Sequence, residues 1–248
     1  MALSVDWRHV TSVRAILRAT MGTRTFEKII ARLEKHYGKP QPPPETDPWS
    51  LILWENVAYL ANDARRRAAF FKLRKRFGTK PSSILAASDD ELLAVTTQGI
   101  LAERFVEKLR ECARTALELY PDTGGDLTPL LELPAAKAKK ALSRFPGIGQ
   151  PGAEKILLFG GAQATLALES NGLRVLTRIG YGEEKKSYST TYRLVRAALE
   201  PELPAEVGAL VEAHQLLRRH GMETCKRSAP RCQDCPVRSL CDYAPRKQ

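Results

Sequence analysis

The chain has 248 residues, 43% of them apolar, which is enough to bury one large core or two smaller ones and excludes a disordered tail. Its 39 lysines and arginines outnumber 28 aspartates and glutamates, for a formal net charge of +11. This charge favours nucleic acid as a partner, with a basic protein that lacks such a role as the alternative. No apolar run approaches the roughly 18 residues of a membrane span, and the first residues do not resemble a signal peptide. We therefore expect a cytoplasmic, nucleoid-associated protein without a membrane partner.

Apolar residues recur every three or four positions along most of the chain, whereas alternation with a period of two is absent. This pattern predicts an all-α protein of many medium helices. Asp47 before Pro48 is typical of a helix cap followed by proline at the first helical position. Turn-rich breaks cover residues 38–44 and 121–126. The predicted helices cover residues 10–36, 48–77, 88–119, 135–145, 152–159, 172–179 and 206–220.

Four of the five cysteines lie within the last 24 residues, which indicates a metal site in a reducing compartment. Their spacing, C-x6-C-x2-C-x5-C, lets one loop bring four thiolates around a single centre. A [4Fe-4S] cluster fits this spacing better than zinc, which more often uses two short cysteine pairs. Zinc and unbound structural cysteines are the alternatives. The expected ligands are Cys225, Cys232, Cys235 and Cys241, while Cys112 is expected to be a buried apolar residue.

Three cations, Lys226, Arg227 and Arg231, lie in the first gap of this cysteine loop. A constrained loop that presents three positive charges suits contact with phosphate. A solvated run of charge is the alternative.

A possible hairpin follows the helix predicted over residues 135–145. Alternate glycines in Pro146-Gly147-Ile148-Gly149 permit a tight turn, and the next helix opens directly afterwards. Backbone N–H groups beside a helix N-terminus can face a phosphate, so we expect these four residues to contact DNA. Taken alone, such a turn is more often simple punctuation than a ligand site.

Three motifs together are more specific: F-P-G-I-G, then L-E-S-N-G-L-R-V, then H-G-x-x-x-C at the start of the cysteine loop. With this combination the chain resembles the helix-hairpin-helix DNA glycosylases, in the iron-sulfur branch that holds endonuclease III and the mismatch adenine glycosylases. The resemblance extends over residues 47–243. It implies two helical lobes, a [4Fe-4S] cluster, and a target base that is flipped out of duplex DNA.

The resemblance also implies domain boundaries. Residues 47–163 correspond to a six-helix barrel that ends in the hairpin. Residues 164–248 correspond to a C-terminal lobe with the cluster loop at 225–241. Residues 1–46 are expected to be a helical extension that packs on the C-terminal lobe.

Glu169 stands where the family has a catalytic aspartate that stabilises positive charge on the sugar. Its carboxylate lies one methylene further from the backbone, and a displacement near ~1 Å can cost on the order of a hundredfold in rate. A helix-start carboxylate favoured by the helix dipole is the alternative role.

Pro151 stands where bifunctional members carry the lysine that forms a Schiff base, so lyase activity is not expected. Lys155 lies one turn later and could substitute for it. A solvated helix lysine is the preferred interpretation of Lys155.

Glu55 matches the catalytic glutamate of the mismatch adenine glycosylases. It is expected on a largely apolar helix face, four residues from Leu51 and from Tyr59. Poor solvation there would favour the protonated form that a general acid needs. An internally paired structural glutamate is the alternative.

Leu60 stands where endonuclease III has a glutamine that fills the space of the flipped base. An apolar wedge can do that task by stacking against neighbouring bases, although a core leucine is the alternative. The basic run over residues 65–76 is expected to face DNA in part, because it covers several helix faces.

These features predict a monofunctional base-excision glycosylase that acts on double-stranded DNA as a monomer. A catalytically silent iron-sulfur protein that binds DNA or lesions is the main alternative. A redox sensor that uses the cluster to tune DNA affinity is a third. The sequence does not identify the target base: thymine or uracil opposite guanine, an alkylated purine and adenine all stay open.

Overall fold

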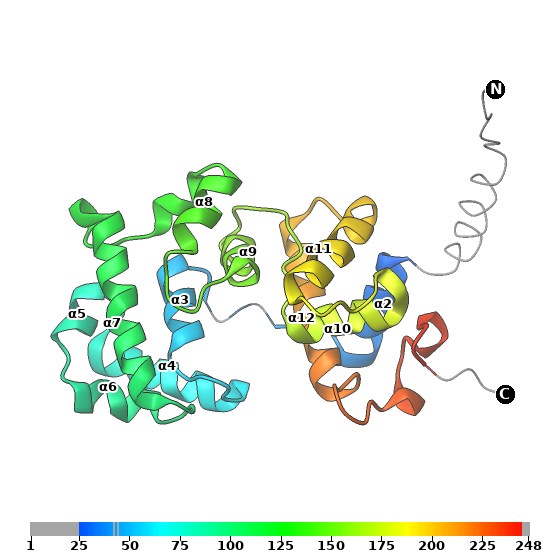
Figure 1. Ribbon diagram of the computed structural model, residues 1–248, viewed down its shortest axis with the longest axis horizontal. Helices are drawn as coiled ribbons and strands as arrows, with labels where there is room; N and C mark the ends of the chain where they lie inside the picture. Colours follow the sequence, from blue (N-terminus) through cyan, green and yellow to red (C-terminus); the bar gives the residue numbers. More distant parts are fainter. Residues whose placement is uncertain (1–24, 42, 44, 245–248) are drawn as a thin grey trace, which may run out of the picture. The chain divides into compact units, whose positions relative to one another are not determined.

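The structure, a computed structural model, describes residues 25–41, 43 and 45–244 (Figure 1). The regular elements in these ranges are all helical, which confirms the predicted all-α class. They group into two compact units. Of the described residues, unit 1 comprises 25–41, 168–204 and 212–244, and unit 2 comprises 43, 45–167 and 205–211. None of the described helices is long and apolar enough to cross a membrane.

Unit 2 is built around one long helix, α7, which packs against α3, α5 and α6. Its buried side chains recur every three or four residues, as in Phe105, Leu109, Cys112 and Ala116. Cys112 is fully buried, as predicted. The helices of unit 2 are α3 (Pro48–Asn56), α4 (Asp63–Phe77), α5 (Pro81–Ala86), α6 (Asp89–Thr96), α7 (Ala102–Leu119), α8 (Ala135–Leu142) and α9 (Gln150–Phe159), with the short turns η1 (Pro121–Thr123) and η2 (Thr128–Glu132).

Helix α3 begins as predicted and ends much earlier. The Asp47 side chain accepts a hydrogen bond of 2.7 Å from the Ser50 backbone N–H, which caps the first turn. The helix predicted over residues 48–77 is wrong, because it is divided into α3 and α4 by an irregular segment that holds Leu60. The helix predicted over residues 88–119 is likewise divided into α6 and α7, at a segment that ends in Leu101.

Unit 1 joins the first described helix to the C-terminal part of the chain. The Phe26 backbone N–H donates to Glu202 (2.6 Å), and Arg219 donates to the Tyr37 carbonyl (3.0 Å). The residues predicted as helical over 10–24 lie outside the described residues, and α11 was not predicted. The elements of unit 1 are α2 (Phe26–Tyr37), α10 (Ser170–Leu176), η3 (Thr177–Tyr181), α11 (Tyr188–Leu199), η4 (Glu200–Glu202), η5 (Cys232–Asp234) and η6 (Arg238–Leu240), together with most of α12 (Val207–Glu223).

Candidate functional site

The predicted hairpin joins α8 to α9 and is fixed to the end of α3. Phe145 and Ile148 are buried beneath the turn, and Gly147 has a φ of +77°, in the region that favours glycine. The Asn56 amide donates to the Pro146 carbonyl (3.0 Å), and a Cβ on Gly147 would lie 3.0 Å from Asn56 Oδ1. The end of α3 therefore holds the hairpin in place.

The outer side of this hairpin presents a helix start to solvent. Gly147 and Gly149 are exposed, and Gly149 is the N-cap of α9, where it offers no capping side chain. Pro151 lies in the first turn and has no backbone N–H. The remaining first-turn N–H groups carry the positive end of the helix dipole, so this end suits an anionic group such as a phosphate.

Glu55 and Lys155 form an ion pair between α3 and α9. Their side chains are 23% and 17% exposed, so Lys155 is not the solvated lysine that the sequence favoured. Helix α3 ends at Asn56, so Tyr59 does not share a helix face with Glu55 as predicted. The carboxylate therefore faces a cation in addition to its apolar surroundings. The site therefore holds a charged pair and not the isolated, poorly solvated acid that was expected.

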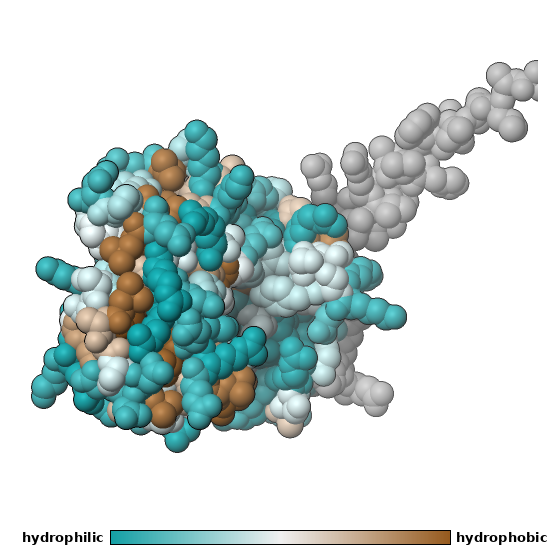
Figure 2. Space-filling model, turned by 60° about the vertical axis from the view of Figure 1, so that its left-hand side comes forward, coloured by the Kyte–Doolittle hydropathy of each residue, from teal (hydrophilic) through white to brown (hydrophobic). Residues whose placement is uncertain are grey.

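Leu60 and Leu101 lie on two adjoining irregular segments, joined by a hydrogen bond from the Ile100 N–H to the Tyr59 carbonyl (3.0 Å). Their side chains are 70% and 54% exposed, so Leu60 is not a core leucine. Both have left-handed backbone, with φ of +53° and +56°, which costs roughly 1–2 kcal/mol for a residue with a Cβ. Exposed apolar residues on strained backbone indicate a contact surface. Apolar patches interrupt the hydrophilic surface on the face shown in Figure 2.

Leu101 was missed because the apolar periodicity runs unbroken through it, and glycine and proline are both missing from the positions next to it. The nearest glycine, Gly99, would have been a signal. A Cβ there would lie 2.4 Å from the Tyr59 backbone nitrogen, so the two segments can pack this closely only with glycine at that position.

The basic run of α4 is partly engaged within unit 2. Arg74 pairs with Glu45 (2.5 Å), and Lys72 donates to the Ala94 carbonyl (2.7 Å). Arg65 and Arg67 are exposed to solvent. Part of the run thus serves the fold, and part is available to a partner.

Glu169 caps the start of α10 in unit 1. Its Oε1 accepts from the Gly172 backbone N–H (2.8 Å), and its Oε2 accepts from the Asn171 side-chain amide (2.8 Å). Both oxygens therefore have donors, and the carboxylate is held rigidly at the positive end of the helix. The helix-start role that the sequence offered for Glu169 is present, together with an amide contact.

Tyr188, which sequence reasoning missed, lies next to this carboxylate. Its hydroxyl donates to the Leu168 carbonyl (3.2 Å), one residue before Glu169. Burial raises the pKa of Tyr188 to about 12, and the negative charge of Glu169 adds to that effect. Tyr188 thus stays a neutral hydrogen-bond donor that fixes the backbone at Glu169. Ser187 caps α11 by accepting from the Thr190 N–H, a cap signature that could have revealed this helix from the sequence.

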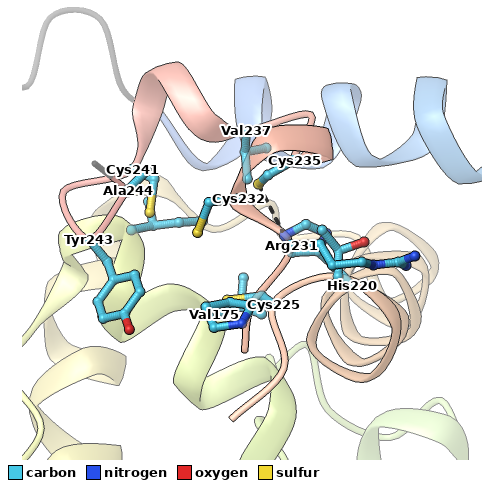
Figure 3. Close-up of a pocket in the computed structure, with 13 residues that line it drawn as sticks. Val175, His220, Cys225, Arg231, Cys232, Cys235, Val237, Cys241, Tyr243 and Ala244 are labelled. Carbon is cyan, nitrogen blue, oxygen red and sulfur yellow. Dashed lines mark hydrogen bonds between the residues drawn. The ribbon is translucent and has the colours of Figure 1, made fainter. Parts of the chain in front are cut away.

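The four C-terminal cysteines line one pocket of unit 1, with about 340 Å³ of atom-free space including open solvent (Figure 3). None of the five cysteines of the chain forms a disulfide. Across the described ranges, no three histidine, cysteine or acidic side chains form a group that could hold a single metal ion. Apolar residues close the rest of the pocket, among them Val175, Ile179, Val237 and Ala244.

Arg178 holds the cysteine loop in shape. Its guanidinium donates to the Lys226 and Arg227 carbonyls (2.7 and 3.0 Å) and approaches Cys225 Sγ at 3.5 Å. The Cys241 thiol in turn donates to the Arg178 carbonyl (3.3 Å). Four thiols around one space, with a cation facing one sulfur, are a donor set that fits an anionic cluster with thiolate ligands.

His220 faces a third sulfur of the pocket. Its Nε2 lies 3.6 Å from Cys235 Sγ, and its Nδ1 lies 2.9 Å from the Tyr37 hydroxyl of α2. Burial lowers the pKa of His220 to about 4 and raises that of Cys235 to about 11. The imidazole thus bridges α2 and the cysteine pocket.

The predicted cations of the cysteine loop are all exposed. Lys226 and Arg227 extend from backbone that Arg178 fixes, whereas Arg231 donates to the Glu223 carbonyl (2.6 Å). The Lys226 and Arg227 side chains are therefore accessible to an anionic partner. The Arg231 side chain also stabilises the loop through its hydrogen bond to the Glu223 carbonyl.

Curated proteins similar to this chain include endonuclease III from several organisms. Endonuclease III of Treponema pallidum is 33% identical over 156 residues, which cover 60% of this chain and 70% of that protein. Endonuclease III of Thermotoga maritima is 22% identical over 222 residues, covering 90% and 94%. No family model matches the chain.

Solved structures show the same fold. A thermostable thymine-DNA glycosylase superposes with a TM-score of 0.70 at 17% identity, covering 90% of this chain and 98% of that one. A trapped covalent intermediate of endonuclease III with DNA superposes with a TM-score of 0.69 at 17% identity, covering 89% and 97%. With its hairpin, its cysteine loop and these relatives, the chain belongs to the helix-hairpin-helix DNA glycosylase superfamily.

Proposed function

We propose that this chain is a DNA N-glycosylase of base-excision repair, which cuts the bond between a flipped base and its sugar in double-stranded DNA. One observation carries the proposal: the end of α3 gathers the parts that such a reaction needs. Asn56 holds the hairpin, Glu55 lies beside it in an ion pair, and Leu60 follows on exposed, strained backbone. A phosphate contact, a proton-transfer group and a wedge thus come from residues 55–60 and the hairpin.

Leu60 and Leu101 would enter the duplex where the target base has left. Apolar wedges of this kind compensate for lost stacking, and the flipped base becomes accessible to side chains. The hairpin, Lys226, Arg227 and Arg231 would bind phosphates and so position the duplex.

The chemistry assigns one role to each carboxylate. The Glu55–Lys155 pair shares protons that can pass to the departing base, which leaves with the electrons of the glycosidic bond. The Glu169 carboxylate stabilises the positive charge that develops on the sugar. Water then adds to that sugar carbon and loses a proton, so the product is an abasic site. Paired carboxylates do the same in glycoside hydrolysis.

The proposed enzyme is monofunctional. Pro151 has no side-chain nucleophile, and the Lys155 amine is engaged as an ammonium group by Glu55.

The proposed cofactor is a [4Fe-4S] cluster held by Cys225, Cys232, Cys235 and Cys241. The support is the pocket that these four residues line and the donors that face their sulfurs. When bound, such a group would fix the loop that carries Lys226 and Arg227.

The alternative is a catalytically silent DNA-binding relative. One observation favours it: both oxygens of Glu169 are already used by the cap of α10. A carboxylate that only caps a helix contributes nothing to the reaction.

The deciding experiment incubates the purified monomeric protein with duplexes that contain mispaired, deaminated, oxidised or alkylated bases. Alkali then cleaves any abasic product, and borohydride traps any covalent imine. We expect strand breaks that require alkali for at least one base, with no trapped adduct. Binding without breaks across the panel would favour the silent relative. A trapped adduct that disappears in Lys155→Met would overturn the monofunctional assignment.

A further inference from the structure

Helix α2 reaches the cysteine pocket through a chain of hydrogen bonds. Thr224 Oγ1 lies 2.7 Å from the Tyr37 hydroxyl, which lies 2.9 Å from His220 Nδ1. His220 Nε2 then lies 3.6 Å from Cys235 Sγ, a distance suited to an N–H···S contact. His220 and Thr224 are buried, at 1% and 3% exposure, so water does not compete for these bonds.

The direction of this chain follows from its last member. A thiolate that ligates iron accepts hydrogen bonds and has no proton to donate. The facing Nε2 must then carry the imidazole proton, which leaves Nδ1 to accept from the Tyr37 hydroxyl. Tyr37 in turn accepts from Thr224. Every donor in the chain therefore points toward the sulfur.

We infer that His220 is a positioning residue for the cluster: it donates to the sulfur of Cys235, and Tyr37 of α2 orients and strengthens that bond. The inference rests on the proposed [4Fe-4S] cofactor and adds to it a task for the N-terminal helix. Hydrogen bonds to ligating sulfurs withdraw negative charge, which stabilises the reduced cluster and raises its reduction potential. Helix α2 would thereby adjust the electron affinity of the cluster.

The test measures the reduction potential of the cluster by voltammetry on the intact, DNA-free protein, after analysis of iron and sulfide. We expect His220→Phe to shift the potential to more negative values. Tyr37→Phe keeps the ring and loses only the hydroxyl, so it should shift the potential in the same direction by less. His220→Gln keeps a side-chain N–H donor and should restore most of the wild-type value.

The matched control is His214→Gln, because His214 is also a buried histidine of α12 and does not line the pocket. Its potential should equal that of the wild type. An unchanged potential in His220→Phe would overturn the inference. If that variant loses its cluster during purification, Tyr37→Phe decides alone, and a wild-type value there overturns the part assigned to α2. A wild-type protein without iron or sulfide would overturn the cofactor and this inference together, whereas base excision would still test the proposed function separately.

Discussion

The two units hold their candidate residues in opposite ways. In unit 2, Leu60 and Leu101 extend from strained backbone, and Glu55 forms an ion pair with Lys155. In unit 1, both carboxylate oxygens of Glu169 accept hydrogen bonds. The Arg178 guanidinium fixes the cysteine loop by donating to two backbone carbonyl groups of that loop. Loosely held groups can follow a partner that changes shape during binding, whereas fixed groups present a charge that needs no rearrangement.

This difference gives separate tasks to the two carboxylates. Glu169 cannot turn away without removing the cap of α10, so it suits a constant negative charge. Glu55 is paired with the ammonium group of Lys155, and a pair of this kind can pass a proton to a departing group. The predictions below test this contrast, beginning with the largest expected effect.

Glu55→Gln should have the largest effect. A glutamine cannot transfer a proton, and loss of a general acid lowers rates by about 10²–10⁴. Single-turnover base release should fall by this factor, while DNA affinity stays close to the wild type. Glu45→Gln is the matched control, because it removes another ion-paired glutamate of unit 2, at Arg74. Equal losses in both variants would contradict the role of Glu55.

Glu169→Gln should follow, with a loss of about 10²–10³ in single-turnover rate, as for other prearranged electrostatic groups. Glu169→Asp keeps the charge and a good capping side chain, so it should recover much of the rate. Glu169→Ala should also lower the free energy of unfolding by about 1 kcal/mol, since the cap is lost. If the single-turnover rates of these three variants change only in proportion to their free energies of unfolding, Glu169 serves as a helix cap and has no role in the reaction.

Leu60→Ala and Leu101→Ala should each weaken binding to lesion-containing duplex by about tenfold. The estimate follows from losing the burial of several methyl and methylene groups, worth about 1.5 kcal/mol. Fluorescence anisotropy with duplex DNA measures the change. Leu194→Ala, at an exposed leucine of α11, should leave the affinity unchanged. A wild-type affinity in both Leu60 and Leu101 variants would remove the wedge from the proposal.

Leu60→Gly and Leu101→Gly should show the smallest effect. They should raise the free energy of unfolding, whereas Glu169→Ala should lower it. Glycine relieves roughly 1–2 kcal/mol of left-handed strain and costs about 0.5–1 kcal/mol in chain entropy, so unfolding becomes less favourable by about 0.5–1 kcal/mol. Denaturant titration measures this gain. Ala229→Gly, at a left-handed position in unit 1, should also gain stability. Leu60→Gly and Leu101→Gly should lose DNA affinity, whereas Ala229→Gly should not. This difference would show that the strained backbone of the two leucines serves DNA binding and that the strained backbone of Ala229 does not.

Much of the molecule could be predicted from local signals. The Asp47 cap, the hairpin at Gly147, the burial of Cys112 and the all-α class each follow from residue types and spacings within a few positions. The cysteine loop could be predicted for the same reason, because its four thiols lie close together along the chain.

The two helix breaks and the ion pair were not predicted. The sequence around Leu60 and Leu101 keeps an apolar helical pattern, and contacts between the two segments override it. The Glu55–Lys155 pair joins residues 100 positions apart, so only the packing of α3 on α9 brings it together. These are the positions where the fold departs from local preference, and they are also the residues proposed to act on DNA.

The contacts of α2 determine when each unit can be completed during synthesis on the ribosome. Most of unit 2 is one continuous stretch, residues 42–167, so its core can form once that stretch has emerged. Unit 1 needs both ends of the chain, because α2 bonds to Glu202, Arg219 and Ser239. Helix α2 is made early and must wait for almost the whole chain before its partners exist. The cysteine pocket can therefore take shape only after the core of unit 2 has emerged, and the proposed cluster would be acquired after that point.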